Sequence, residues 1–255
     1  MGKPFDKLDL GQELEQEAPI FELSDTSKSI VPIVDRKRAS KFSKEDFADR
    51  RIIHPGMADI EVLSAFRELR TTIIPRMESF NSVLQISSVQ GGGGASFSAI
   101  NLAVSCTFEQ HRHALIVDCN FVRPSLAKTL DVEPKAGLFD FLTDRVGSVS
   151  DIVYPTRIPR LSVVPSGEIQ TEDHIEFFTG ENMRIFLEDV KNRYDDRIII
   201  IDAPPVLESA DAKILAEVTD YVLLVLPYKG AGANKVNKII KAVGNDKVIG
   251  VMINN

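Results

Sequence analysis

The chain has 255 residues, of which 44% are hydrophobic and 26% are charged, and its formal net charge is −7. This length suits one large α/β domain or two small ones, and the negative charge argues against a nucleic-acid partner or broad binding to anionic membranes. Two cysteines without metal-ligand spacing, no signal-peptide core and no apolar run of about 20 residues indicate a cytoplasmic chain that reaches a membrane only through a partner.

Residues 1–55 are polar and irregular, and charge is dense in "DRKRASKFSKEDFADRR" at 35–51. This composition predicts a flexible, mostly disordered N-terminal arm, with residues 56–255 forming the folded domain. Such an arm is either a solvated tail or a docking segment for a partner.

A helix is expected over residues 57–74. Apolar residues at positions 60, 62, 63, 66, 69 and 73 share one face of a helix. Arg67 and Arg70 lie three residues apart on its more polar side, where they are available for an interface or simply solvated.

From there on, apolar strands and helices alternate. The pattern predicts strands at 82–88, 114–119, 197–205, 221–227 and 248–254, and helices at 96–110, 181–193, 209–217 and 231–243. Continuously apolar strands between helices are typical of a parallel sheet that is covered on both faces. We therefore expect a doubly wound α/β fold.

A run of glycines lies between the first of these strands and its helix, in "QGGGGASFSAINLA" at 90–103. This placement resembles a phosphate-binding loop, in which backbone N–H groups hold an anion at a helix N-terminus. Ser96 stands where a hydroxyl would bind Mg²⁺, but Ala95 stands where the P-loop lysine would reach the phosphates. The candidate nucleotide-binding residues are Gly91, Gly92, Gly93, Gly94, Ala95, Ser96, Phe97 and Arg123.

Two later strands end in acids, Asp118 in "LIVDCN" and Asp202 in "IIIIDAPP". Ligands collect at the carboxyl ends of parallel strands, and carboxylates there hold Mg²⁺ or its waters. Together with Ser96 these acids form a candidate magnesium site. The alternative is a tight glycine turn followed by acids that cap the next helices.

These stretches resemble the cytoplasmic domain of the bacterial tyrosine autokinases of capsule and exopolysaccharide synthesis. That family lies within a deviant P-loop group which includes partitioning and septum-placement ATPases. The resemblance runs from about residue 58 to the end and rests on "SAFRELRTTI" (64–73), "SSVQGGGGASFSAINLA" (87–103), "ALIVDCNFVRPSL" (114–126), "GLFDFL" (137–142), "LSVVPSG" (161–167), "DDRIIIIDAPPVLESADAKILAE" (195–217) and "VIGVMIN" (248–254).

The chain departs from the family pattern at its catalytic motifs. The resemblance implies a lysine followed by Ser-Thr in the loop, and here these positions read Ala95, Ser96 and Phe97. It implies a D-x-D motif followed by arginine, of which Asp118 and Arg123 remain. Asn120 stands in place of the second aspartate of this motif, and Val122 precedes the arginine. The third motif, D-T-P-P, keeps Asp202 but has Ala203 in place of threonine.

Two further departures concern assembly and the phosphate acceptor. The family's arginine helix begins E-x-x-R-x-x-R and is implied to pack against a neighbouring subunit; Ser64 replaces the glutamate, whereas Arg67 and Arg70 remain. The family's tyrosine cluster is missing, since the four tyrosines are scattered. A lone lysine-to-alanine change is also a common engineered change, and the number of departures favours natural divergence.

The resemblance and its departures together lead to an expected function. We expect a non-catalytic, kinase-like subunit, peripheral to the inner membrane, that acts with a membrane polysaccharide co-polymerase on chain length or export and assembles with itself or an active paralogue. Asp118, Asn120 and Asp202 are then remnants of catalytic motifs, and binding of ATP, ADP and Mg²⁺ is weak or absent. The alternatives are a weakly active ATPase or tyrosine autokinase, and a positioning ATPase, against which the arginine helix argues.

Overall fold

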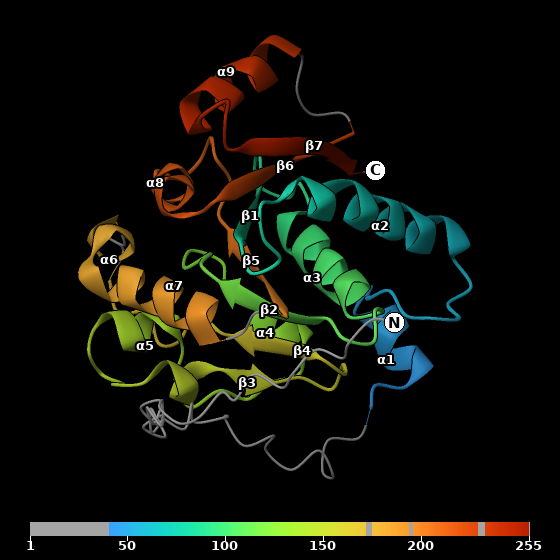
Figure 1. Ribbon diagram of the computed structural model, residues 1–255, viewed down its shortest axis with the longest axis horizontal. Helices are drawn as coiled ribbons and strands as arrows, with labels where there is room; N and C mark the ends of the chain where they lie inside the picture. Colours follow the sequence, from blue (N-terminus) through green and yellow to red (C-terminus); the bar gives the residue numbers. More distant parts are fainter. Residues whose placement is uncertain (1–40, 172–174, 194–195, 229–232, 255) are drawn as a thin grey trace, which may run out of the picture. The chain divides into compact units, whose positions relative to one another are not determined.

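The computed structural model describes residues 41–171, 175–193, 196–228 and 233–254 (Figure 1). Within these residues, seven strands form one sheet in the order β3-β4-β2-β5-β1-β6-β7. The strands are β1 (Val83–Ser88), β2 (His113–Asp118), β3 (Tyr154–Pro155), β4 (Leu161–Val164), β5 (Arg197–Ala203), β6 (Tyr221–Pro227) and β7 (Val248–Asn254). The expected α/β sheet is confirmed with one correction, because β3 pairs antiparallel with β4.

The helices are α1 (Lys44–Asp49), α2 (Ile60–Ile73), α3 (Ala95–Cys106), α4 (Leu126–Thr129), α5 (Leu138–Leu142), α6 (Ile175–Thr179), α7 (Glu181–Arg193), α8 (Asp211–Val218) and α9 (Ala233–Val243), with two 3-10 turns, η1 (Ile74–Arg76) and η2 (Val149–Ile152). The predicted helices correspond to α2, α3, α7, α8 and α9. None of the described helices is long and apolar enough to span a membrane.

The sheet is covered on both faces. Leu84 and Ile86 of β1 pack in one buried cluster with residues of α2 and α3. Leu115 and Val117 of β2 belong to a second buried cluster, which includes residues of α5 and α7. Since side chains alternate across a strand, both faces of the central strands must be apolar, and this explains why the strands read as continuous apolar runs.

The segment just before α2 corrects the expected boundary of the N-terminal arm. Residues 41–55 were expected to be flexible, but Ile52 and Ile53 are only 2% and 1% exposed. The buried amide of Asn101 holds this segment, because its Oδ1 accepts the Ile53 N–H at 2.8 Å. The apolar residues here follow no helix or strand period, so the sequence pattern hid them. Residues 1–40, which make up the rest of the arm, lie outside the described residues.

Candidate functional site

The glycine run forms the expected turn between β1 and α3. Gly92 and Gly94 have φ values of +73° and +90°, a left-handed conformation that glycine adopts without strain. Gly94 is the N-cap of α3, which begins at Ala95. The helix N-terminus and the loop N–H groups therefore provide the elements of an anion site.

The carboxylate of Glu208 lies against the start of this loop. Its Oε1 accepts the Gly91 N–H at 2.6 Å, and a Cβ added to Gly91 would lie 2.9 Å from Oε2. The chain after β5 brings it there, because the N–H groups of Val206 and Leu207 donate to carbonyls of β1 and the loop. Glu208 was not among the predicted site residues, and no sequence pattern around it predicts this contact.

Asn254, at the end of β7, covers the other end of the loop. Its Nδ2 donates to the Gly93 carbonyl at 3.4 Å, and a Cβ on Gly94 would collide with its amide group. The long glycine run indicates that another group lies close to this backbone, but the sequence does not indicate that this group is Asn254.

The two motif acids are brought together as predicted. Asp118 of β2 and Asp202 of β5 are register partners on adjacent strands, and both are buried. Burial of a carboxylate disfavours its charged form, and a second carboxylate nearby adds to the effect. Their proximity is therefore an electrostatic conflict that a proton or a cation relieves.

Asp118 is largely engaged by backbone groups. Its Oδ2 accepts the N–H groups of Ser125 at 2.9 Å and Leu126 at 3.0 Å, and its Oδ1 accepts that of Asn120 at 3.2 Å. Burial raises the pKa of Asp118 to about 6, although these hydrogen bonds oppose the rise. The hydrogen bonds to Ser125 and Leu126, at the start of α4, correspond to the capping alternative, and the role of Asp118 as a magnesium ligand stays a prediction.

Asp202 is different, because neither of its buried carboxylate oxygens accepts a hydrogen bond in ordinary geometry from the described residues. Burial, and then the Asp118 charge, raise the pKa of Asp202 well above its usual range, while the Ser96 hydroxyl acts in the opposite direction. An unpartnered buried carboxylate fits a cation. Among the described residues no cluster of three or more His, Cys, Asp or Glu surrounds it, so Mg²⁺ held by these two acids and Ser96 would take further ligands from water or phosphate.

Of the remaining predicted loop and motif residues, Ala95 and Phe97 are uncharged and add no cation to the site. Ala95 is 8% exposed and contributes only a methyl group. Phe97 packs edge-on against Phe66 with ring centroids 5.6 Å apart, so it joins α3 to α2. Arg123 is exposed, and its backbone N–H donates to the Asn120 side chain in a turn.

The two arginines of α2 turn toward the C-terminal end of α3. Arg70 donates to the Ser105 carbonyl at 2.6 Å and lies 3.6 Å from Glu109, while the guanidinium of Arg67 lies 5.7 Å from the Phe108 ring centroid. A cation at this end of a helix is stabilising. Arg70 is thus committed within the chain, which weakens its expected role at an interface; Arg67 is exposed.

Comparison with known proteins decides the family. The model of the AAA domain family matches residues 81–249, which contain the loop and both acids. The tyrosine-protein kinase CpsD of Streptococcus agalactiae is 30% identical over 180 residues, covering 68% of this chain and 74% of that protein. The chain is a member of the bacterial tyrosine-kinase family. The tyrosine-protein kinase wzc of Salmonella typhi is 28% identical over 167 residues, covering 65% of this chain and 22% of that much longer protein.

Solved structures show the same fold. The chimerical protein CapA2B2 matches with a TM-score of 0.70 at 24% identity, covering 85% of this chain and 92% of that one. The kinase domain of the Escherichia coli tyrosine kinase ETK also has a TM-score of 0.70, at 21% identity, covering 85% and 88%. A more distant neighbour, cobyrinic acid a,c-diamide synthase of Mycobacterium smegmatis, has a TM-score of 0.55 at 17% identity, covering 68% and 74%, and its structure holds ADP and magnesium.

Proposed function

We propose that this chain is a non-catalytic, kinase-like subunit of an exopolysaccharide synthesis or export system. It would act in the cytoplasm, at the inner membrane, with a polysaccharide co-polymerase that regulates chain length. The membership in the tyrosine-kinase family supports the setting. The observation that carries the loss of activity is the glycine loop, which has no lysine and has an acidic side chain against its backbone.

The physical argument rests on charge. Phosphoryl transfer proceeds by positioning and by neutralising the charge of the transferring group. Ala95 supplies no cation, and losing one preorganised donor costs roughly 3–4 kcal/mol of transition-state stabilisation. Glu208 adds a negative charge where phosphates would approach. Asn120 has an amide, which cannot take up the proton of an acceptor hydroxyl.

Incubation with labelled ATP and Mg²⁺ tests the proposal directly. The purified chain, alone and with its membrane partner, is expected to show no phosphotyrosine by mass spectrometry, and calorimetry is expected to show weak or absent binding of Mg-ATP. A related active kinase domain serves as the positive control. Phosphotyrosine that disappears in Asp202→Asn would contradict the proposal.

One observation favours a second candidate, a weakly active ATPase or tyrosine kinase. Asp118 and Asp202 remain in register, and Asp202 is unpartnered and fit for a cation. In this case a cation from elsewhere, such as Arg123 or a neighbouring subunit, would replace the lysine. ATP hydrolysis that depends on Asp202 and on protein concentration would support this candidate.

A further inference from the structure

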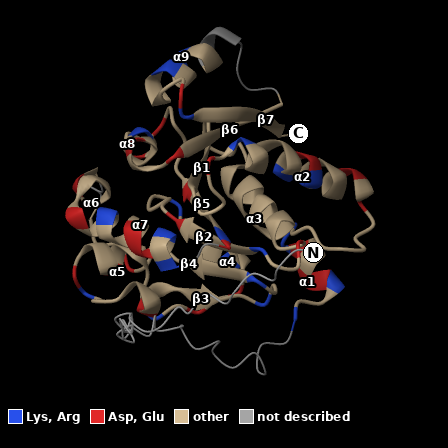
Figure 2. Cartoon of the chain, viewed as in Figure 1, with Lys and Arg blue, Asp and Glu red and all other residues tan. Residues whose placement is uncertain are grey.

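The N-terminal segment, residues 41–53, is connected to the acid pair through helix α4. It consists of α1 and the residues on either side of it, and Phe42, Ile52 and Ile53 are buried. Residues of both charge signs lie along α1 (Figure 2), so its attachment to the domain depends on particular contacts rather than on its overall charge. The contact that matters for the site is made by Arg50.

Arg50, the C-cap of α1, binds the end of α4. Its Nη1 donates to the carbonyls of Lys128 at 2.9 Å and Thr129 at 3.1 Å, which are the last two residues of α4. The last carbonyls of a helix have no partner within the helix, and a cation beside them is stabilising. Arg50 therefore caps α4 from a position 78 residues earlier in the chain.

The opposite end of α4 is held by the candidate site. Asp118 Oδ2 accepts the N–H groups of Ser125 and Leu126, where α4 begins. A helix of four residues has no stability of its own, since isolated helices need about 12 residues or more. The position of α4 therefore depends on Asp118 at one end, on Arg50 at the other, and on the buried side chains of Leu126 and Leu130.

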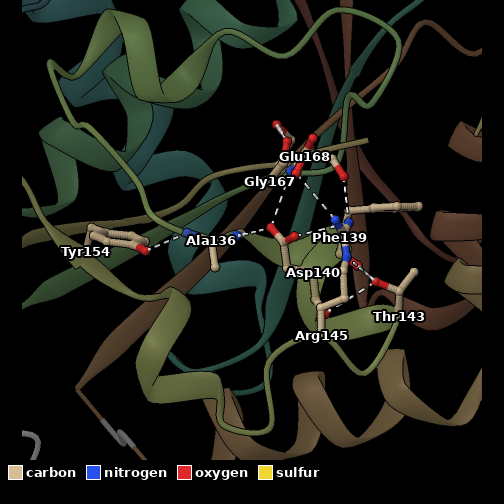
Figure 3. A network of polar contacts seen from close by, with 10 residues as sticks. Ala136, Phe139, Asp140, Thr143, Arg145, Tyr154, Gly167 and Glu168 are labelled. Atoms are coloured by element: carbon tan, nitrogen blue, oxygen red, sulfur yellow. Dashed lines mark hydrogen bonds and ion pairs between the residues drawn. The ribbon is translucent and has the colours of Figure 1, made fainter. Parts of the chain in front are cut away.

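Helix α5 is also short, but its caps are local. Its third residue, Asp140, accepts the Gly137 N–H at 2.7 Å and pairs with Arg145 at 3.1 Å (Figure 3). Both partners lie within a few residues of Asp140, so α5 carries these contacts with it wherever it lies. In α4, by contrast, the C-terminal carbonyls are bound by the distant Arg50, so the contact exists only while the N-terminal segment is in place.

We propose that Arg50 is a positioning residue for the acid pair. By holding the C-terminal end of α4, it fixes the N–H groups at the other end, and these orient Asp118 beside Asp202. Hydrogen-bonded partners orient metal ligands, and their loss typically weakens metal binding by about 10- to 100-fold. Release of the N-terminal segment would loosen Asp118 and lower the affinity of the pair for a cation. This inference rests on the candidate cation site and not on whether the chain transfers phosphate.

Arg157 offers a matched control for Arg50. Both guanidinium groups pair with Asp131, at 2.8 Å and 3.5 Å, and both lie near the Phe42 ring, 5.6 Å and 5.1 Å from its centroid. The bonds to the α4 carbonyls come from Arg50. Arg157→Ala therefore removes a similar charge and ring contact and leaves the end of α4 capped. Arg50→Lys keeps an ammonium group, which can donate to the same carbonyls.

Amide hydrogen exchange, measured for single residues by NMR on the full chain, tests the coupling. In Arg50→Ala the amides of Ser125 and Leu126 should exchange about fivefold faster or more, because local opening of α4 becomes easier. The Ser98 amide, in the first turn of α3, should exchange as in the parent. Arg157→Ala should leave all three amides unchanged, and Arg50→Lys should retain most of the protection. Parental exchange in Arg50→Ala, or equal acceleration of all three amides, overturns the proposal.

Titration with Mn²⁺, followed by electron paramagnetic resonance, tests the effect on the acid pair. Arg50→Ala should weaken binding about threefold or more, less than the loss of a direct partner of a metal ligand, because Arg50 acts through α4. Arg157→Ala should bind like the parent, and Asp202→Asn should abolish binding. An affinity that Arg50→Ala leaves unchanged, or the lack of any Mn²⁺ binding that depends on Asp202, overturns the proposal. Phosphotyrosine formation would contradict the non-catalytic function and would leave these two measurements unaffected.

Discussion

Glu208 Oε1 accepts the backbone N–H of Gly91 at 2.6 Å, so an acidic side chain of the chain itself lies against its glycine loop. Loops of this type bind anions through their backbone N–H groups. The Glu208 carboxylate occupies one of these N–H donors, and its negative charge would repel a phosphate at the loop. The loop therefore has two separate handicaps toward phosphate, an absent cation and an added negative charge.

Replacing Glu208 by glutamine should raise the affinity for ATP or inorganic triphosphate. Because the carboxylate is exposed, we expect a gain of about two- to fivefold. Isothermal titration calorimetry at low ionic strength measures it, with the exposed Glu217→Gln on α8 as control. Equal affinity in both variants would show that Glu208 does not limit the loop.

Ala95→Lys should restore phosphate binding by about tenfold or more, the range of a hydrogen bond to a charged group. Ala95 is the first residue of α3, directly after Gly94. The combination with Glu208→Gln should exceed either single variant in the same calorimetric titration. If the lysine changes nothing in either background, the loop backbone itself is unsuited to phosphate.

Asp202→Asn should alter the pH dependence of stability. The folded-state pKa of Asp202 is raised, so its contribution to stability is fully present below the unfolded-state pKa near 4 and is lost as pH rises toward the folded-state value. The variant lacks this loss. Its free energy of unfolding relative to the parent should therefore increase with pH, by at most about 1.4 kcal/mol per unit.

Urea unfolding between pH 5 and 8 measures this difference. Asp49→Asn, at an exposed position of α1, provides the control and should run parallel to the parent. A difference between Asp202→Asn and the parent that stays constant with pH would mean that Asp202 is ionised in the folded protein.

The two arginines of α2 should differ in their contribution to stability, since Arg70 is bonded within the chain and Arg67 is exposed. Arg70→Ala removes the hydrogen bond to the Ser105 carbonyl at the end of α3 and should lower the free energy of unfolding by about 1–3 kcal/mol. Arg67→Ala should change it by less than about 1 kcal/mol. The role of Arg67 at an interface is tested with the single variant Arg67→Ala. Light scattering after size exclusion measures the mass of its assembly, without and with the membrane partner. Assembly of this variant like the parent, in both settings, would remove Arg67 from the interface.

The fold was predictable because its central strands are buried on both faces. Each of β1, β2, β5 and β6 reads as an apolar run, and each was predicted to within two residues of its bounds. The region from α4 to β4 was not assigned to elements, because its helices are only four and five residues long and its β3 has two residues. Elements this short carry no measurable period.

The candidate site was predictable only where backbone geometry determines it. Asp118 and Asp202 lie at the carboxyl ends of parallel strands, so their meeting at one edge of the sheet was implied by the pattern. The contacts of Glu208 and Asn254 with the loop depend on how the chain turns after β5 and where β7 ends. Such contacts join positions more than 100 residues apart, and no local spacing records them.

Asn101 joins helix α3, which follows the glycine loop, to residues 51–53 at the beginning of the domain. Its side chain accepts from the Ile53 N–H and donates to the Arg51 and Phe97 carbonyls. Residues 51–53 are thus hydrogen-bonded to the same helix whose first turn would hold an anion. If a bound ligand displaced α3, residues 51–53 would move with it. A displacement of residues 51–53 would, in the same way, be transmitted through α3 to the loop.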